Sequence, residues 1–164
     1  MDASFLELTR EERQRLLAQK RAILAARTRC KQLSGVEIIA LLDGEEYPPL
    51  SRMYAAYCSY MCNDTVPTSR LPHSAPREQI CAWVVATMGL QEGQEYFYLC
   101  GGGFWAHIRL TDLTLAVPTL LGECVEGFLL AEVDLSRMLE VGFDSRDEEH
   151  YLIDIWNRTP PDHV

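Results

Sequence analysis

The sequence predicts an α+β domain in which about three N-terminal helices pack on a C-terminal antiparallel β-meander of about five strands. Two observations predict this class. Apolar residues recur at helical spacing in the first part of the chain, whereas from Glu95 onward their period is two, with glycines and acidic turns between the runs. The 164 residues, 48% of them apolar, are enough for one domain with a sizeable core. We expect a single domain over residues 1–164, made of a basic helix (1–34), a helical part (35–92), the sheet (93–157) and a tail (158–164).

The first helix is predicted over residues 10–32. Thr9 followed three residues later by Glu12 has the form of a capping box, and Ser34-Gly35 supplies the stop. A narrow apolar seam with spacings of seven residues runs along this basic helix, formed by Leu16, Leu17, Ile23, Leu24 and Cys30. Such a seam suits one partner helix, which belongs to the same chain, to a second subunit or to a target protein. A homodimer through helix 10–32 is therefore one open alternative.

The helical part contains two further predicted helices. The apolar run 36–42 fits either a buried strand or a helix turn, and we favour the helix. A helix begins at Pro48, and residues 63–74, rich in Pro, Thr and Ser, form the expected loop after it. The next helix lies between Pro76 and Gly89, since proline is tolerated in a first turn and glycine ends helices.

The strands of the meander are predicted near residues 95–100, 104–110, 127–134, 138–143 and 150–156. The segment between the second and third strands, residues 111–126, stays unassigned, because Pro118 and Gly122 interrupt it.

The glycine loop at residues 101–103 defines the first hairpin. It places His107 opposite Phe97, three rungs or ~10 Å from Cys100 and on the other face of the sheet, which argues against a local cysteine nucleophile with a histidine base. The same register puts Trp105, His107 and Arg109 on one face. Tryptophan and arginine are residue types that anchor binding partners, although a Trp105 covered by the basic helix is an equally good structural reading.

The last three strands predict a row of carboxylates. Turns at 135–137 and 145–149 place Glu132 opposite Glu140, and Glu140 opposite Asp154. The row is extended by Asp134, Asp144 and His150. In this register one face, the core face, carries the apolar residues Leu129, Ala131, Val133, Leu139, Val141, Phe143, Tyr151, Ile153 and Ile155.

Directly opposed like charges destabilise a sheet, so the row needs compensation. Three kinds of compensation for these charges are possible. They are water or a local arginine (Arg109, Arg137 or Arg158), a basic protein partner, or a divalent metal ion.

Charge is divided unevenly along the chain, whose net charge is −9. Residues 1–32 hold eight cations and four carboxylates, a balance of +4, whereas residues 33–164 hold seven cations and 20 carboxylates, a balance of −13. An acidic surface repels nucleic acid and membrane phosphates, so we expect neither as a partner. No apolar stretch reaches the ~20 residues of a membrane-spanning helix, and the N-terminus lacks the layout of a secretory signal, which predicts a cytoplasmic protein.

The six cysteines are expected to be free thiols in a reducing compartment. No C-x-x-C pair occurs, although Cys58, Cys62, His73 and Cys81 allow a zinc site to be drawn. We expect no cofactor.

The sequence favours a binding protein over an enzyme. It contains no phosphate-binding glycine loop and no G-x-S-x-G elbow. In size, charge and its acidic, aromatic-bearing sheet (residues 126–156), the chain is similar to bacterial toxin-immunity proteins, which implies an inhibitor that binds a basic protein. The expected partner-binding residues are Glu132, Glu140, Asp144, Asp147, Glu148, Asp154, Trp105, Trp156 and Arg109. The alternative is a metal-dependent hydrolase or small-ligand-binding protein that uses Glu132, Glu140, Asp154 and His150.

Overall fold

The computed structural model describes residues 8–158. Its helices are α1 (Arg10–Lys31), α2 (Pro48–Met61), α3 (Arg77–Met88) and α4 (Leu113–Leu121). Its strands are β1 (Val36–Asp43), β2 (Ser69–Pro72), β3 (Glu95–Gly101), β4 (Phe104–Leu110), β5 (Phe128–Glu132), β6 (Arg137–Gly142) and β7 (His150–Asn157). The α+β class is confirmed, with more helices and strands than the sequence analysis expects.

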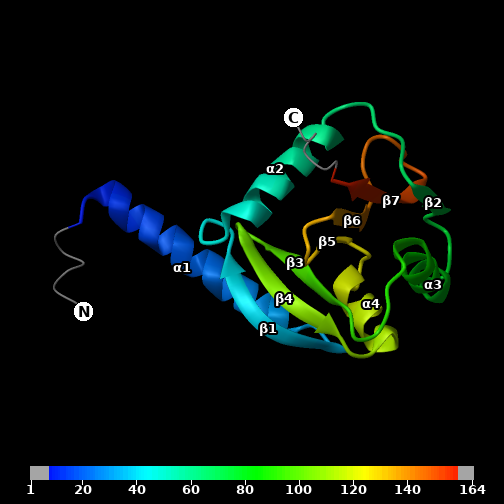
Figure 1. Cartoon of the computed structure of the whole chain (residues 1–164), viewed down its shortest axis with the longest axis horizontal. Coiled ribbons are helices and arrows are strands. Elements are labelled where there is room, and N and C mark those ends of the chain that lie inside the picture. Colours follow the sequence, from blue (N-terminus) through cyan, green and yellow to red (C-terminus); the bar gives the residue numbers. More distant parts are fainter. Residues whose placement is uncertain (1–7, 159–164) are drawn as a thin grey trace.

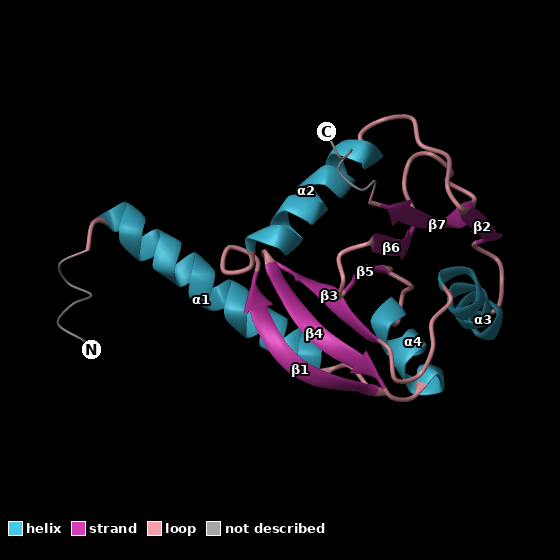
Figure 2. Cartoon of the chain, in the orientation of Figure 1, coloured by secondary structure: helices cyan, strands magenta, loops and turns pink. Residues whose placement is uncertain are grey.

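All seven strands belong to one antiparallel sheet in the order β1-β4-β3-β5-β6-β7-β2 (Figure 2). The five strands of the predicted meander occupy the middle of this sheet. Strands β1 and β2, which come from the part of the chain expected to be helical or looped, form its two edges.

Helices cover both faces of the sheet (Figure 1). Helix α2 packs Leu50, Met53 and Tyr57 on one face, which we call the α2 face. On the opposite face, the α3/α4 face, α3 and α4 pack with the end of α1. Buried apolar residues from neighbouring strands meet these helices on each side, so the domain has two core layers separated by the sheet.

Helix α1 begins and ends close to its predicted bounds. The capping box between Thr9 and Glu12 is confirmed, since each side chain accepts a hydrogen bond from the other residue's backbone N–H. Only the C-terminal part of α1 lies on the sheet, and its N-terminal half extends away from the rest of the domain (Figure 1). Leu17 and Leu24 of the seam are exposed, Leu24 by 66%, while Ala26 is buried. The seam is thus only partly covered within the described chain.

Three segments differ from the sequence prediction. Residues 36–42 belong to edge strand β1 instead of a helix, and the expected loop 63–74 contains the short strand β2. The unassigned segment 111–126 contains α4, which begins at the N-cap Asp112 and includes Pro118. The prediction of a helix over 36–42 was wrong because a short apolar run without alternation does not distinguish a strand from a helix.

The predicted register of the β3–β4 hairpin is confirmed at its centre, where Phe97 pairs with His107. Ala106, Ile108 and Leu110 face the α3/α4 core, whereas Trp105 faces the α2 core, as the alternation predicts.

The predicted register between β5 and β6 is wrong. Leu129 pairs with Glu140 and Leu130 pairs with Leu139, so Glu132 does not lie opposite Glu140. The turn comes earlier than expected, because Leu135 adopts a left-handed backbone conformation (φ 59°) and donates its N–H to the Glu132 carbonyl. A displacement by an odd number of residues moves every side chain to the other face, so Glu132 lies on the α3/α4 face, and Leu129 and Ala131 pack under α2.

Candidate functional site

The sheet forks between β3 and β5. These strands pair only from Tyr96 to Tyr98, opposite Leu130 to Glu132. Beyond that point β3 contains an irregularity between Leu99 and Gly101 in its pairing with β4. A β-bulge bends its strand and increases the local twist, and the fork begins where this one occurs. A cavity of about 410 Å³ occupies the fork.

Four carboxylates line this cavity, which we call the acidic pocket. They come from three places in the chain: the turn before β5, strand β6 with its following loop, and strand β7. They are Glu126, Glu140, Asp144 and Asp154. The remaining walls are backbone and apolar side chains of β3, β5 and β6, together with Phe143 and Leu152.

Glu140 and Asp154 are the two less exposed carboxylates among the four. They lie directly opposite each other on β6 and β7, as the sequence predicts. The phenol of Tyr57 on α2 donates a hydrogen bond to the Glu140 carboxylate. Burial of the carboxyl group raises the pKa of Glu140, and the neighbouring Asp154 acts in the same direction. Ionisation of Glu140 beside a charged Asp154 is therefore unfavourable unless a cation lies nearby.

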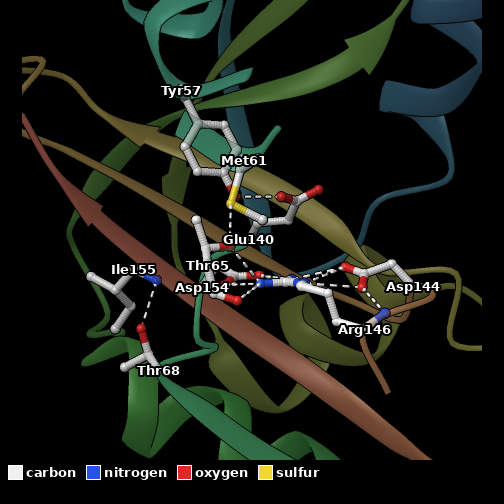
Figure 3. A network of polar contacts seen from close by, with 9 residues as sticks. All are labelled: Tyr57, Met61, Thr65, Thr68, Glu140, Asp144, Arg146, Asp154 and Ile155. Carbon is white, nitrogen blue, oxygen red and sulfur yellow. Dashed lines mark hydrogen bonds and ion pairs between the residues drawn. The ribbon is translucent and has the colours of Figure 1, made fainter. Parts of the chain in front are cut away.

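Arg146, in the loop between β6 and β7, supplies a cation to the cluster (Figure 3). Its guanidinium donates two hydrogen bonds to Asp154, at 2.6 and 3.0 Å, and further bonds to Asp144 at 2.8 and 3.0 Å. Its Nη1 also donates to the Thr65 hydroxyl at 3.0 Å. These contacts hold the pKa of Asp144 below its usual range and allow Asp154 to be buried with only 6% exposure.

The other predicted carboxylates lie outside the pocket and have partners of their own. Glu132 accepts hydrogen bonds from Arg137 and Ser136 on the α3/α4 face. Asp147 contacts Arg70 and His150, each at 2.9 Å, and Glu148 is exposed in the β6–β7 loop. The predicted continuous row is therefore wrong: the structure joins Glu140, Asp144 and Asp154 and separates Glu132 from them.

The predicted aromatic anchors differ in exposure. Trp105 is only 2% exposed and packs edge-on against Tyr54 of α2, so it is a core residue in this structure. The helix that covers it is α2 and not the basic helix of the prediction. Trp156 is half-buried beside Tyr57 and Tyr60 of α2.

Arg109 does not compensate the row either. It bonds Glu37 on β1 and Glu95 on β3, and Glu95 also contacts His107 at 2.9 Å. Of the three arginines considered from the sequence, Arg137 alone bonds a member of the predicted row. Within the chain, Arg137 therefore compensates the charge of Glu132. Arg146, which the sequence analysis did not consider, compensates the charge of Asp154.

The sequence analysis missed four residues of the site: Tyr57, Glu126, Phe143 and Arg146. The sequence holds one indication of Arg146, which is the single cation in an otherwise acidic loop. Phe143 was assigned to the core face, yet it is 58% exposed and packs at the rim of the pocket on His73 and Tyr151. Nothing local in the sequence brings Tyr57 or Glu126 to β6.

A larger cavity of about 900 Å³ lies between α1 and the glycine loop of the β3–β4 hairpin. Its lining is mainly apolar, with Glu12, Arg15, Asp43 and Glu45 spread around it. The acidic pocket is the candidate site because four acidic residues line it and two of them, Asp144 and Asp154, bond the same arginine, Arg146.

Within residues 8–158, no three His, Cys, Asp or Glu side chains are grouped as metal ligands. None of the helices described has the length and apolar character needed to cross a membrane. Comparison of the sequence with protein-family models, with curated proteins and with solved structures finds no significant match.

Proposed function

We propose that this chain is a non-enzymatic binding domain that neutralises or regulates a basic protein partner in the cytoplasm, and that the acidic pocket receives a lysine or arginine side chain of that partner. One observation carries the proposal: four acidic residues line one cavity, whereas Arg146 is the one cation that bonds any of them within residues 8–158. A second cation entering the pocket gains charge-assisted hydrogen bonds with oxygens that lie in a partly buried place, where electrostatic attraction is stronger than in water.

The surroundings of the pocket favour a macromolecular partner over a small ligand. Phe143 presents an exposed aromatic ring at the rim, a residue type that interfaces enrich. The loop after β6 adds Asp147, Glu148 and Glu149 to Asp144, with Arg146 as its single cation. Clustered charge of one sign steers an oppositely charged protein and fixes its orientation.

A toxin-immunity-type inhibitor is the specific form of this proposal. It agrees with the acidic charge of residues 33–164 and with a pocket that accepts a basic side chain. The metal-dependent alternative has less support, because it needs Glu132 beside Glu140, and Glu132 lies on the opposite face of the sheet. Pairing of two copies through the exposed residues of α1 is a separate proposal, compatible with either function.

The test uses a pair of charge-reversal variants in the full-length protein. Glu126 lines the pocket, and Glu78 is an exposed carboxylate of α3 that lines neither of the two cavities described above. Neither side chain forms an ion pair within the described part of the chain. Wild type, Glu126→Lys and the control Glu78→Lys are immobilised and exposed to native lysate, and bound proteins are quantified after elution with salt. We expect a basic protein that wild type and Glu78→Lys retain and that Glu126→Lys loses.

The purified candidate is then tested by association kinetics at several salt concentrations. Glu126→Lys is expected to slow association and to flatten the salt dependence. If the captured proteins are acidic, or if both variants retain them equally, the proposed function is wrong.

A further inference from the structure

The thiols of Cys30 and Cys100 lie together although 70 residues separate them in the chain. Cys30 is in the last turn of α1 and Cys100 is at the irregularity of β3, and their sulfur atoms are 3.8 Å apart. Both side chains are half-buried. All six cysteines lie within residues 8–158, and no second pair of their sulfur atoms is in contact.

Neighbouring contacts hold the two thiols in this arrangement. Arg29, next to Cys30, donates a hydrogen bond from Nε to the Tyr98 hydroxyl at 2.7 Å and bonds from Nη2 to the carbonyls of Thr119 and Leu120 at 2.9 and 3.1 Å. These bonds attach the end of α1 to both β3 and α4. The sulfur atoms of a disulfide are about 2.05 Å apart, so the pair must approach by roughly 1.8 Å, a movement within the range of side-chain rotation.

A small oxidant has a route to the pair. Cys30 is half-buried and keeps part of its surface in contact with solvent, and Cys100 lines the acidic pocket, which opens to solvent at the fork of the sheet. The exposed thiols of Cys58, Cys62 and Cys124 meet solvent directly, but none of them has a second thiol in contact to complete a disulfide.

We propose that Cys30 and Cys100 are a redox modification site that forms a reversible intramolecular disulfide with hydrogen peroxide as the oxidant. The thiolate of Cys30 attacks one peroxide oxygen, the O–O bond breaks, and the hydroxide that leaves takes up the thiol proton to form water. The sulfur of Cys100 then attacks the resulting sulfenic acid, the S–O bond breaks, and the second water leaves with the Cys100 proton. Two thiols are oxidised to one disulfide and one peroxide is reduced to two waters.

The surroundings support this order of steps. Burial raises the pKa of Cys100 to about 12, and the adjacent Cys30 adds to the effect. A protonated thiol is a poor first nucleophile for peroxide, so Cys100 suits the second step, in which its target is a sulfenic acid held in contact.

The cross-link has a structural consequence. Residues 10–31 hold all eight cations of the N-terminal region, and the projecting half of α1 is attached to the domain through its C-terminal turns. Oxidation makes this attachment covalent at a wall of the acidic pocket. The inference does not depend on the proposed function, since the two thiols are in contact whatever the pocket binds.

The test uses the full-length protein with Cys58, Cys62 and Cys124 replaced by serine, which leaves three thiols. The reduced protein is treated with stoichiometric hydrogen peroxide, and the remaining thiols are alkylated with N-ethylmaleimide and counted by mass spectrometry. We expect a fall from three alkylated thiols to one, a peptide pair joining Cys30 to Cys100, and reversal by dithiothreitol. The thermal midpoint rises on oxidation, because the cross-link closes a long loop.

Three matched variants in the same background distinguish this pair from other reactions. With Cys30→Ser, both remaining thiols stay reduced. With Cys100→Ser, no disulfide forms and oxidation stops at the sulfenic acid of Cys30, while Cys81 stays reduced. With Cys81→Ser, both remaining thiols are lost together. The proposal is overturned if three thiols persist after peroxide, if the peptide pair contains Cys81, or if oxidation ends in sulfinic acid at one cysteine.

Discussion

Replacing Arg146 by methionine tests how strongly the acidic cluster depends on this cation. The substitution keeps an unbranched apolar stem and removes the guanidinium, which donates two hydrogen bonds to Asp154. Asp154 is then left as a carboxylate with 6% exposure, opposite Glu140 and without its cation.

The expected loss follows from the burial of the pair. Breaking a buried ion pair by removing one partner costs about 3–5 kcal/mol, because a charge is left buried without compensation. The Arg146 side chain keeps 20% of its surface exposed, so water partly solvates the site once it is gone. We therefore expect the lower end of the range, about 3 kcal/mol of the free energy of unfolding.

Urea unfolding followed by tryptophan fluorescence measures the effect, with Arg137→Met as the matched control. Arg137 bonds Glu132 in a pair whose side chains are 36% and 23% exposed, and such pairs contribute about 1 kcal/mol or less. A loss of 3 kcal/mol lowers the urea midpoint by about 1–2 M at an unchanged slope.

Adding Asp154→Asn to Arg146→Met removes the uncompensated charge and is expected to restore more than half of the lost stability. Asp154 does not depend on Arg146 in this way if Arg146→Met destabilises the protein no more than Arg137→Met, or if Asp154→Asn restores nothing.

Three further predictions concern stability. Burial raises the pKa of Glu140 above its ordinary value of 4.5, so its stabilising contribution is present below pH 4.5 and is lost as the pH rises through the raised pKa. The Glu140→Gln variant therefore gains stability relative to wild type as the pH rises from 4.5 to 7. A difference in urea midpoint that does not change with pH contradicts this prediction. Gly127→Ala places a Cβ 2.1 Å from the Val141 carbonyl oxygen at φ +91°, and we expect it to lower the free energy of unfolding by about 3 kcal/mol or more. The control Gly93→Ala, also at positive φ but in open space, is expected to lower it by about 1–2 kcal/mol. Equal losses of stability in urea unfolding argue against the contact at Gly127. Trp105→Ala is expected to cost about 3–5 kcal/mol as a core truncation, and a thermal midpoint near that of wild type is incompatible with its burial under α2.

The parts of the site that the sequence predicts correctly depend on strong local signals. Glycines 101–103 and clean alternation on both sides give the β3–β4 register, and alternation in β6 and β7 gives the pairing of Glu140 with Asp154. In both hairpins, only one register places the apolar residues on a single face.

Strand β5 lacks such a signal. Residues 128–131 are Phe, Leu, Leu and Ala, all buried because helices cover both faces of the sheet. An apolar run that is buried on both faces of a sheet is compatible with either register, so the turn at Leu135 sets the register of β5 with β6. A leucine is not recognisable from the sequence as a turn residue with positive φ. Glu132 was therefore assigned to the wrong face.

Local signals in the sequence predict the α+β class, the capped basic helix, the central hairpins and the pairing of two carboxylates on β6 and β7, because periodicity, capping residues and turn glycines act over a few residues. The structure was needed to reveal the edge strands, the fork at Cys100, the positions of Tyr57, Glu126 and Arg146 around the acidic pocket, and the contact between Cys30 and Cys100. These features depend on how segments far apart in the chain pack against one another, and the apolar runs at β1 and β5 are compatible with more than one such packing.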